Sequence, residues 1–155
     1  MAELFWWIAY TVCGIWIQAL VPGVDCFGPA LLLCLQTGRN RSAFWLALPW
    51  VLLQEGSGSL PFGTALLYYG GLIYFFFGTR PYIDVESPVF ILLCSLFAGI
   101  WHFVALQALT SLQGIQTLEQ QILFQSLRLT VAFLILWALL GIIYYARIQP
   151  HHARS

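Results

Sequence analysis

The chain has 155 residues, of which 61% are hydrophobic and 8% are charged. Soluble domains carry roughly 25% charged residues, so this composition excludes an ordinary soluble globular domain. Because each transmembrane helix needs about 20 residues, the length allows at most about six spans. We therefore predict an all-α integral membrane protein, a compact bundle of about six transmembrane helices with short loops, as a single domain over residues 1–155. The formal net charge is zero and says nothing about nucleic acid or acidic substrates, so no such partner is predicted from it.

The arginines fall almost entirely in alternate gaps between the apolar runs. These gaps contain Arg39, Arg41, Arg80, Arg147 and Arg154. The intervening gaps share an acidic residue: Asp25, Glu55 and Glu119. Cytoplasmic loops of membrane proteins are enriched in arginine and lysine, so this alternation predicts a multi-pass protein with both termini in the cytoplasm.

The first apolar run, residues 4–21, is just long enough at 1.5 Å per residue to cross a hydrocarbon core of about 30 Å. Pro22, Gly23 and Asp25 follow as an outer turn. The second helix is predicted over 27–37. Pro29 suits its first turn, because an N–H is not needed there.

The second run and the third, predicted over 42–55, are both short, so a re-entrant hairpin is the alternative to two spans. Arg39 and Arg41 at the tip distinguish the two arrangements. In a hairpin each arginine would enter the membrane at a cost of at least about 2.5 kcal/mol, whereas two short spans leave both at the inner surface. We therefore predict two spans.

A break rich in glycine and serine, residues 54–63, follows the third run. Its backbone N–H and C=O groups cannot face lipid unsatisfied, so we expect it in the outer interface or beneath neighbouring helices. Glu55, Ser57 and Gly58 in this break are candidate structural or partner-binding residues.

The fourth helix is predicted over 62–78. It carries Gly63 and Gly70 seven residues apart on one face, where a second helix could approach closely. That helix could belong to a partner or to the bundle itself. Arg80 then opens the second inner loop.

The fifth helix is predicted over 88–111. Its Ala98, His102 and Ala105 share a face by their spacing, and we expect this face to point into the bundle. His102 near the middle suggests a proton relay or a catalytic base. The simpler interpretation is a histidine whose hydrogen bond is satisfied by a neighbouring carbonyl or by Gln107.

Residues 113–128 are rich in glutamine, with Ile115, Leu118 and Ile122 at helical spacing, and we predict an amphipathic helix in the outer interface. The last span is predicted over 129–147. Arg128 departs from the charge pattern. Its side chain either extends outward to the surface or forms an ion pair with Glu55 or Glu119.

No catalytic residue, cofactor or metal site is predicted. The four cysteines have no C-x-x-C spacing, and three of them lie in apolar runs. Glu55 is the one acid near a plausible cavity, so a carboxylate pair for acid–base work or for a divalent cation is lacking. Ser57 and Ser59 with His102 are faintly similar to a rhomboid-type serine protease. However, Glu55 stands where the G-x-S-G motif of that family has its first glycine.

The layout resembles the family of the rod shape-determining protein MreD. Members of this family are small bacterial inner-membrane proteins. Residues 27–33 resemble the proline-led start of the short, leucine-rich second helix of that family, and the basic turn 38–41 follows. Residues 53–63 resemble its acidic residue, Ser-Gly and later glycine, with Glu55 in place of the usual aspartate. The fourth helix, an arginine-bearing inner loop and a long fifth helix then come in the expected order.

This resemblance implies a non-enzymatic scaffold of the cell-elongation machinery in the bacterial inner membrane. Its partners would be the bitopic protein MreC and, with the MreB filament and peptidoglycan synthases, other proteins of the elongation complex. The candidate structural or partner-binding residues are Glu55, Ser57, Gly58, Gly63, Gly70, His102 and Arg128.

The alternative function is solute uptake, because the substrate-binding component of energy-coupling-factor transporters also has six helices. Such a protein needs an outward pocket with a few polar groups. Candidates for those groups are Gln54, Glu55, Ser57, His102 and Gln107. The alanines four residues apart by which such components dock are reduced here to Ala9 and Cys13.

Overall fold

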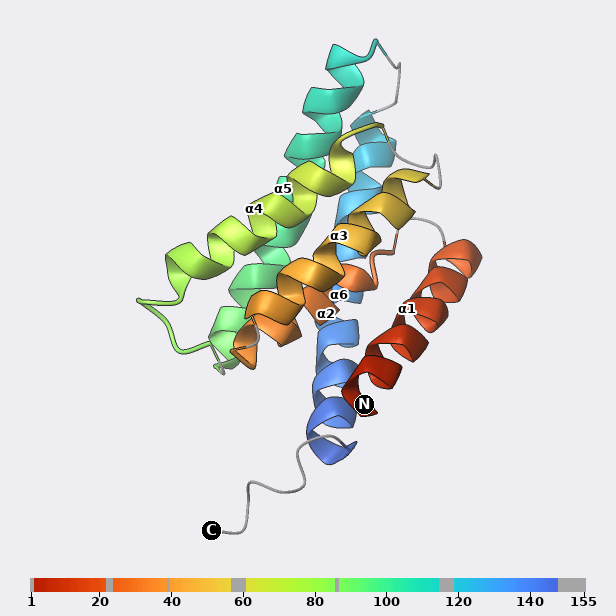
Figure 1. Cartoon of the computed structure of the whole chain (residues 1–155). Helices are drawn as coiled ribbons and strands as arrows, with labels where there is room; N and C mark the ends of the chain where they lie inside the picture. Colours follow the sequence, from red (N-terminus) through yellow and green to blue (C-terminus); the bar gives the residue numbers. More distant parts are fainter. Residues whose placement is uncertain are drawn as a thin grey trace, which may run out of the picture.

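The computed structural model describes residues 2–21, 24–38, 40–56, 61–85, 87–114 and 119–147. Within these ranges the chain forms six α-helices: α1 (Ala2–Leu20), α2 (Phe27–Gln36), α3 (Asn40–Gly56), α4 (Thr64–Thr79), α5 (Pro88–Leu112) and α6 (Glu119–Arg147). They gather into one bundle, with α1 at one edge (Figure 1). The predicted all-α class is confirmed.

Helix α2 forms the centre of the bundle. Every residue of α2 except Gln36 is buried, and α2 packs against α3, α4 and α6. A helix that is apolar around its whole circumference is stable only when neighbours enclose it. At its last residue, the Gln36 side chain donates to Val85 O at 2.7 Å and accepts from Trp137 Nε1 at 2.9 Å.

Helices α5 and α6 form the longest packed pair. Ser87 caps α5, because its Oγ accepts a hydrogen bond from Phe90 N at 3.1 Å. Gly114, with φ +66°, follows the last turn of α5 as the left-handed residue that commonly ends a helix. A Cβ atom at Gly99 would overlap Thr130 Oγ1 and lie 3.3 Å from Ser126 O, so glycine allows the two helices to approach closely.

The prediction of a separate helix over 113–128 is wrong from Glu119 onward, and residues 115–118 lie outside the described residues. Residues from Glu119 onward form the first turns of α6, which continues to Arg147. Neither glycine nor proline interrupts residues 119–140, and glutamine and leucine both favour helix, so the chain has no reason to stop at Arg128. The first five predicted helices overlap α1 to α5 closely, and the predicted span over 129–147 is the later part of α6.

Among the described residues, two helical segments are long and apolar enough to cross a bilayer: Pro88–Leu112 and Glu119–Ile143. Three further apolar helices are shorter: Phe5–Leu20, Phe27–Gln36 and Thr64–Thr79. By length and composition, α5 and α6 are therefore the helices that support membrane association.

Candidate functional site

Asp25 is buried between α1 and α2, although the sequence predicts it in an outer turn. Its side chain is 7% exposed. Its two carboxylate oxygens accept hydrogen bonds from Phe27 N at 2.9 Å and Gly28 N at 3.0 Å. The first N–H groups of a helix have no partner within the helix, and the helix dipole favours a negative charge at this end. Asp25 therefore stabilises the start of α2.

Three side chains from other helices also donate to Asp25, and all three reach Oδ1. Gln54 Nε2 of α3 lies 2.8 Å away, and the Tyr69 hydroxyl of α4 also lies 2.8 Å away. Gln18 Nε2 of α1 is more distant, at 3.4 Å. We call Gln18, Asp25, Gln54 and Tyr69 the Asp25 cluster. One carboxylate thus joins α1, α2, α3 and α4.

The five donors described around Asp25 are all electrically neutral: two backbone amides, two side-chain amides and one phenol hydroxyl. Together they replace the hydration that a buried carboxylate loses. A carboxyl group held in this way is a fixed hydrogen-bond acceptor. In the described part of the chain, no group of three or more His, Cys, Asp or Glu side chains is placed to hold a metal ion.

Helix α1 is attached to the bundle next to this cluster. The Tyr10 hydroxyl donates to Cys26 O, and Trp50 Nε1 of α3 donates to Thr11 Oγ1 at 2.9 Å. A Cβ atom at Gly14 would lie 2.7 Å from the Phe27 ring, so this glycine lets α1 lie against α2. The edge helix is therefore held by a few specific contacts close to Asp25.

His102 is buried, as predicted for its face of α5. His102 is 7% exposed, and Ala98 and Ala105 beside it are at most 1% exposed. Its Nδ1 lies 3.2 Å from Ser126 Oγ of α6. The His102 and Tyr68 rings pack edge to face, with their centroids 5.6 Å apart. Among the described residues the partner of His102 Nδ1 is therefore Ser126, whereas the sequence predicts a carbonyl or Gln107.

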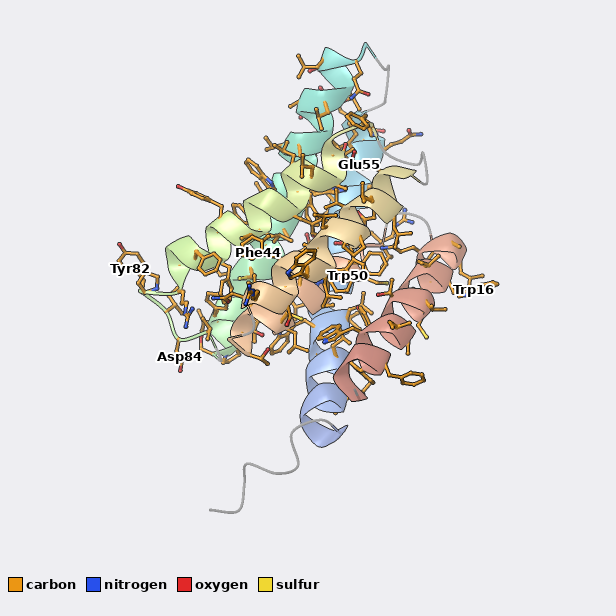
Figure 2. The ribbon with its side chains drawn as sticks, viewed as in Figure 1. Trp16, Phe44, Trp50, Glu55, Tyr82 and Asp84 are labelled. Carbon is orange, nitrogen blue, oxygen red and sulfur yellow. The ribbon has the colours of Figure 1, made fainter. Side chains whose placement is uncertain are left out.

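Gln107 instead lies with its Nε2 at 3.5 Å from Glu119 Oε1, on the outside of α5 and α6. Glu55 lies at the end of α3, where its Oε1 accepts a hydrogen bond from Leu66 N of α4 at 3.3 Å. Figure 2 shows Glu55 near the end of α3 that lies toward the beginning of α4. Neither glutamate belongs to the Asp25 cluster.

The candidate glycines of α4 have different surroundings. Gly63 precedes α4 with φ +90°, a conformation that favours glycine, and Gly70 is exposed with nothing within 4 Å of an added Cβ atom. The neighbouring Gly71 is the closely packed one, because a Cβ there would overlap the Trp101 indole. Ser57 and Gly58 lie outside the described residues.

Arg128 lies on α6 with its side chain exposed. Its position is compatible with a side chain that extends toward the surface. The ion pair with Glu55 or Glu119 stays a prediction.

Sequence reasoning missed the Asp25 cluster. A signal was present, because Asp25 lies directly before the helix that Pro29 begins, and aspartate is favoured next to a helix N-terminus. The donors gave no such signal, since Gln54 and Tyr69 are far from Asp25 in the chain and Gln18 lies on the preceding helix. No protein-family model, curated protein or solved structure matches this chain.

Proposed function

We propose that the chain is a multi-pass membrane protein whose bundle faces lipid, and that it acts as a non-enzymatic scaffold in bacterial cell elongation. The outward surface supports the membrane assignment. Large apolar side chains are exposed along α1, among them Phe5 at 74%, Trp16 at 68% and Leu20 at 77%. Figure 2 shows Trp16 directed away from the bundle. Soluble monomers rarely expose large contiguous apolar patches, whereas lipid covers them at no cost.

Helix α6 supports the same assignment. Only 28% of its most apolar segment is buried, whereas the core helix of a soluble protein would be mostly enclosed. The interior, in contrast, contains polar side chains: Asp25, Thr64, Ser95, His102, Thr110 and Ser126. Polar groups directed inward and apolar groups directed outward are typical of a membrane bundle.

The short α2 is compatible with this arrangement, because protein and not lipid surrounds it. Its 10 residues rise about 15 Å from the basic turn, which is about half of a hydrocarbon core of about 30 Å. Asp25 would then lie near the middle of the membrane. Non-helical backbone is tolerated at that depth only when protein encloses it, and Asp25 and Cys26 are 7% and 1% exposed.

The scaffold role rests on the resemblance to the MreD family together with the exposed helix surfaces. We propose that an MreC-like bitopic membrane protein contacts the bundle with its transmembrane helix, next to other elongation proteins. The open surface at Gly70 is the contact that we propose on α4, because small residues let helices pack closely in lipid. The cytoplasmic side would carry both termini, Arg41 and Arg80.

The test is affinity purification of the tagged full-length chain from native membranes in mild detergent, followed by mass spectrometry. Recovery of an MreC-like protein and wall synthases is the expected result. Recovery of ATPase subunits with a transmembrane coupling protein would instead support solute uptake and overturn the scaffold proposal. Extraction of the chain from membranes by alkaline carbonate would overturn the membrane assignment itself.

A matched pair of variants tests the contact on α4. Gly70→Leu is expected to reduce recovery of the partner while the thermal stability of the chain stays unchanged. Gly78→Leu adds the same side chain to the same helix, also at a position with nothing within 4 Å, and is expected to leave recovery unchanged. Equal recovery from both variants would contradict a partner contact at Gly70.

A further inference from the structure

A groove with a volume of about 230 Å³ lies between α1 and α3, which are neighbours at the edge of the bundle (Figure 1). Among the described residues, the helix pairs with extensive contacts do not include α1 and α3, so the space between them stays open. We call it the α1–α3 groove. Among its lining residues are Trp7, Thr11 and Val12 of α1 and Leu46, Pro49 and Trp50 of α3.

Two tryptophan rings form the floor of the groove. Trp7 is 6% exposed and Trp50 is 1% exposed, and their ring centroids lie 6.2 Å apart. The Trp50 ring also stacks on Phe27 of α2, with the centroids 5.0 Å apart, and its Nε1 donates to Thr11 Oγ1 at 2.9 Å. Trp50 is therefore held by two further helices, and the floor does not need to rearrange to receive a ligand.

The groove suits an apolar ligand. The Thr11 hydroxyl is already used twice, because it donates to Trp7 O at 2.7 Å and accepts from Trp50 Nε1. Val12, Leu46 and Pro49 have no side-chain group that forms hydrogen bonds. A polar ligand would therefore lose its hydration here without gaining partners in return.

The groove opens onto the apolar outer surface of the bundle. Ile8 and Val12 line it and are also 55% and 49% exposed. Residues 7–12 and 46–50 lie near the middle of α1 and of α3. In the membrane that we propose for this chain, the groove therefore opens at the depth of the lipid chains.

The dimensions of the groove distinguish a lipid chain from a partner helix. At 1.5 Å per residue, residues 7–12 extend about 7.5 Å along α1. A helix with its side chains is about 10–12 Å wide, which is too wide for a volume of about 230 Å³ over this length. An extended hydrocarbon chain is much narrower, and in a bilayer it runs in the same general direction as the helices.

We propose that one acyl chain of a membrane phospholipid occupies the α1–α3 groove. The proposal rests on the membrane location proposed above. The chain covers the two tryptophan rings and fills the space between α1 and α3, so that lipid contributes to the attachment of the edge helix.

The test measures the lipid that stays bound when the full chain is purified from native membranes and washed in mild detergent. Native mass spectrometry of the unchanged chain should show one bound phospholipid. Val12→Trp fills the groove, so the bound fraction should fall by roughly tenfold. Ile15→Trp is the matched control, because it adds the same ring to α1 at a 42% exposed position outside the groove, and it should keep the lipid. Equal retention by both variants, or no lipid on the unchanged chain, would overturn the proposal.

Cross-linking in the membrane gives a second readout that needs no variant. Phospholipids with a photoreactive group in the acyl chain should label Trp7 and Trp50 although both are buried, whereas lipids around the bundle reach only exposed side chains such as Trp16 and Trp45. Labelling confined to the exposed side chains would overturn the proposal, and so would cross-links from the groove to a partner protein in place of lipid. A chain that stays in the membrane during alkaline carbonate treatment but shows no lipid in the groove refutes this proposal alone, whereas extraction by carbonate refutes the membrane location.

Discussion

Asp25→Ala is the substitution expected to weaken this fold most, because one side chain serves four helices. Its removal leaves the amides of Phe27 and Gly28 without the acceptor that stabilises the start of α2, which costs about 1 kcal/mol. It also leaves the Gln54 amide and the Tyr69 hydroxyl, both at 2.8 Å from Oδ1, without their acceptor. Each buried donor left unpaired costs about 1–3 kcal/mol.

These costs do not add fully. Alanine also removes a buried carboxyl group whose own transfer from water is unfavourable, and nearby side chains can rotate toward other acceptors. We therefore expect the free energy of unfolding to fall by about 3 kcal/mol, a value near the lower end of the summed costs. The chain should still form its helices, because α2 keeps its apolar packing against α3, α4 and α6.

The assay is unfolding of the purified protein in mixed micelles with increasing sodium dodecyl sulfate, followed by tryptophan fluorescence. Trp50 is a suitable reporter, since it is 1% exposed and bonded to α1 through Thr11. Asp84→Ala is the control, because it removes the same side chain from an exposed loop position, shown at the edge of the molecule in Figure 2. A loss below about 1 kcal/mol for Asp25→Ala, or an equal loss for both variants, would refute the central role of Asp25.

Three further predictions concern packing. Gly71→Ala should destabilise by about 1–3 kcal/mol because its Cβ would overlap the Trp101 indole, whereas Gly70→Ala should be near neutral; equal Tm values would contradict this. Trp50→Phe should cost about 1 kcal/mol or more through loss of the bond to Thr11, and labelling of Cys26, which is 1% exposed and bonded to Tyr10 of α1 through its carbonyl, should then quicken; an unchanged labelling rate argues against this attachment. The predicted ion pair of Arg128 with Glu55 is tested by Arg128→Ala and Glu55→Ala, whose losses of stability should be non-additive by more than about 0.5 kcal/mol; additive losses would contradict the pair.

The amino-acid sequence by itself determined the local features of this protein. Apolar runs interrupted by glycine, proline and charged residues place five of the six helices, because these interruptions act on the backbone within a few residues. The spacing of Ala98, His102 and Ala105 is likewise local, and it correctly assigns their face of α5 to the interior. The prediction for the glutamine-rich residues before Arg128 was wrong, because a change from apolar to polar side chains does not by itself end a helix.

Only the tertiary structure decided that Asp25 is buried. Its donors Gln18, Gln54 and Tyr69 come from three helices, and no periodicity in the sequence indicates which polar side chains of different helices meet. The difference between Gly70 and Gly71 arises in the same way, because it depends on where Trp101 of α5 lies. A polar residue in an apolar chain is visible in the sequence, but its partner is set by how the helices pack.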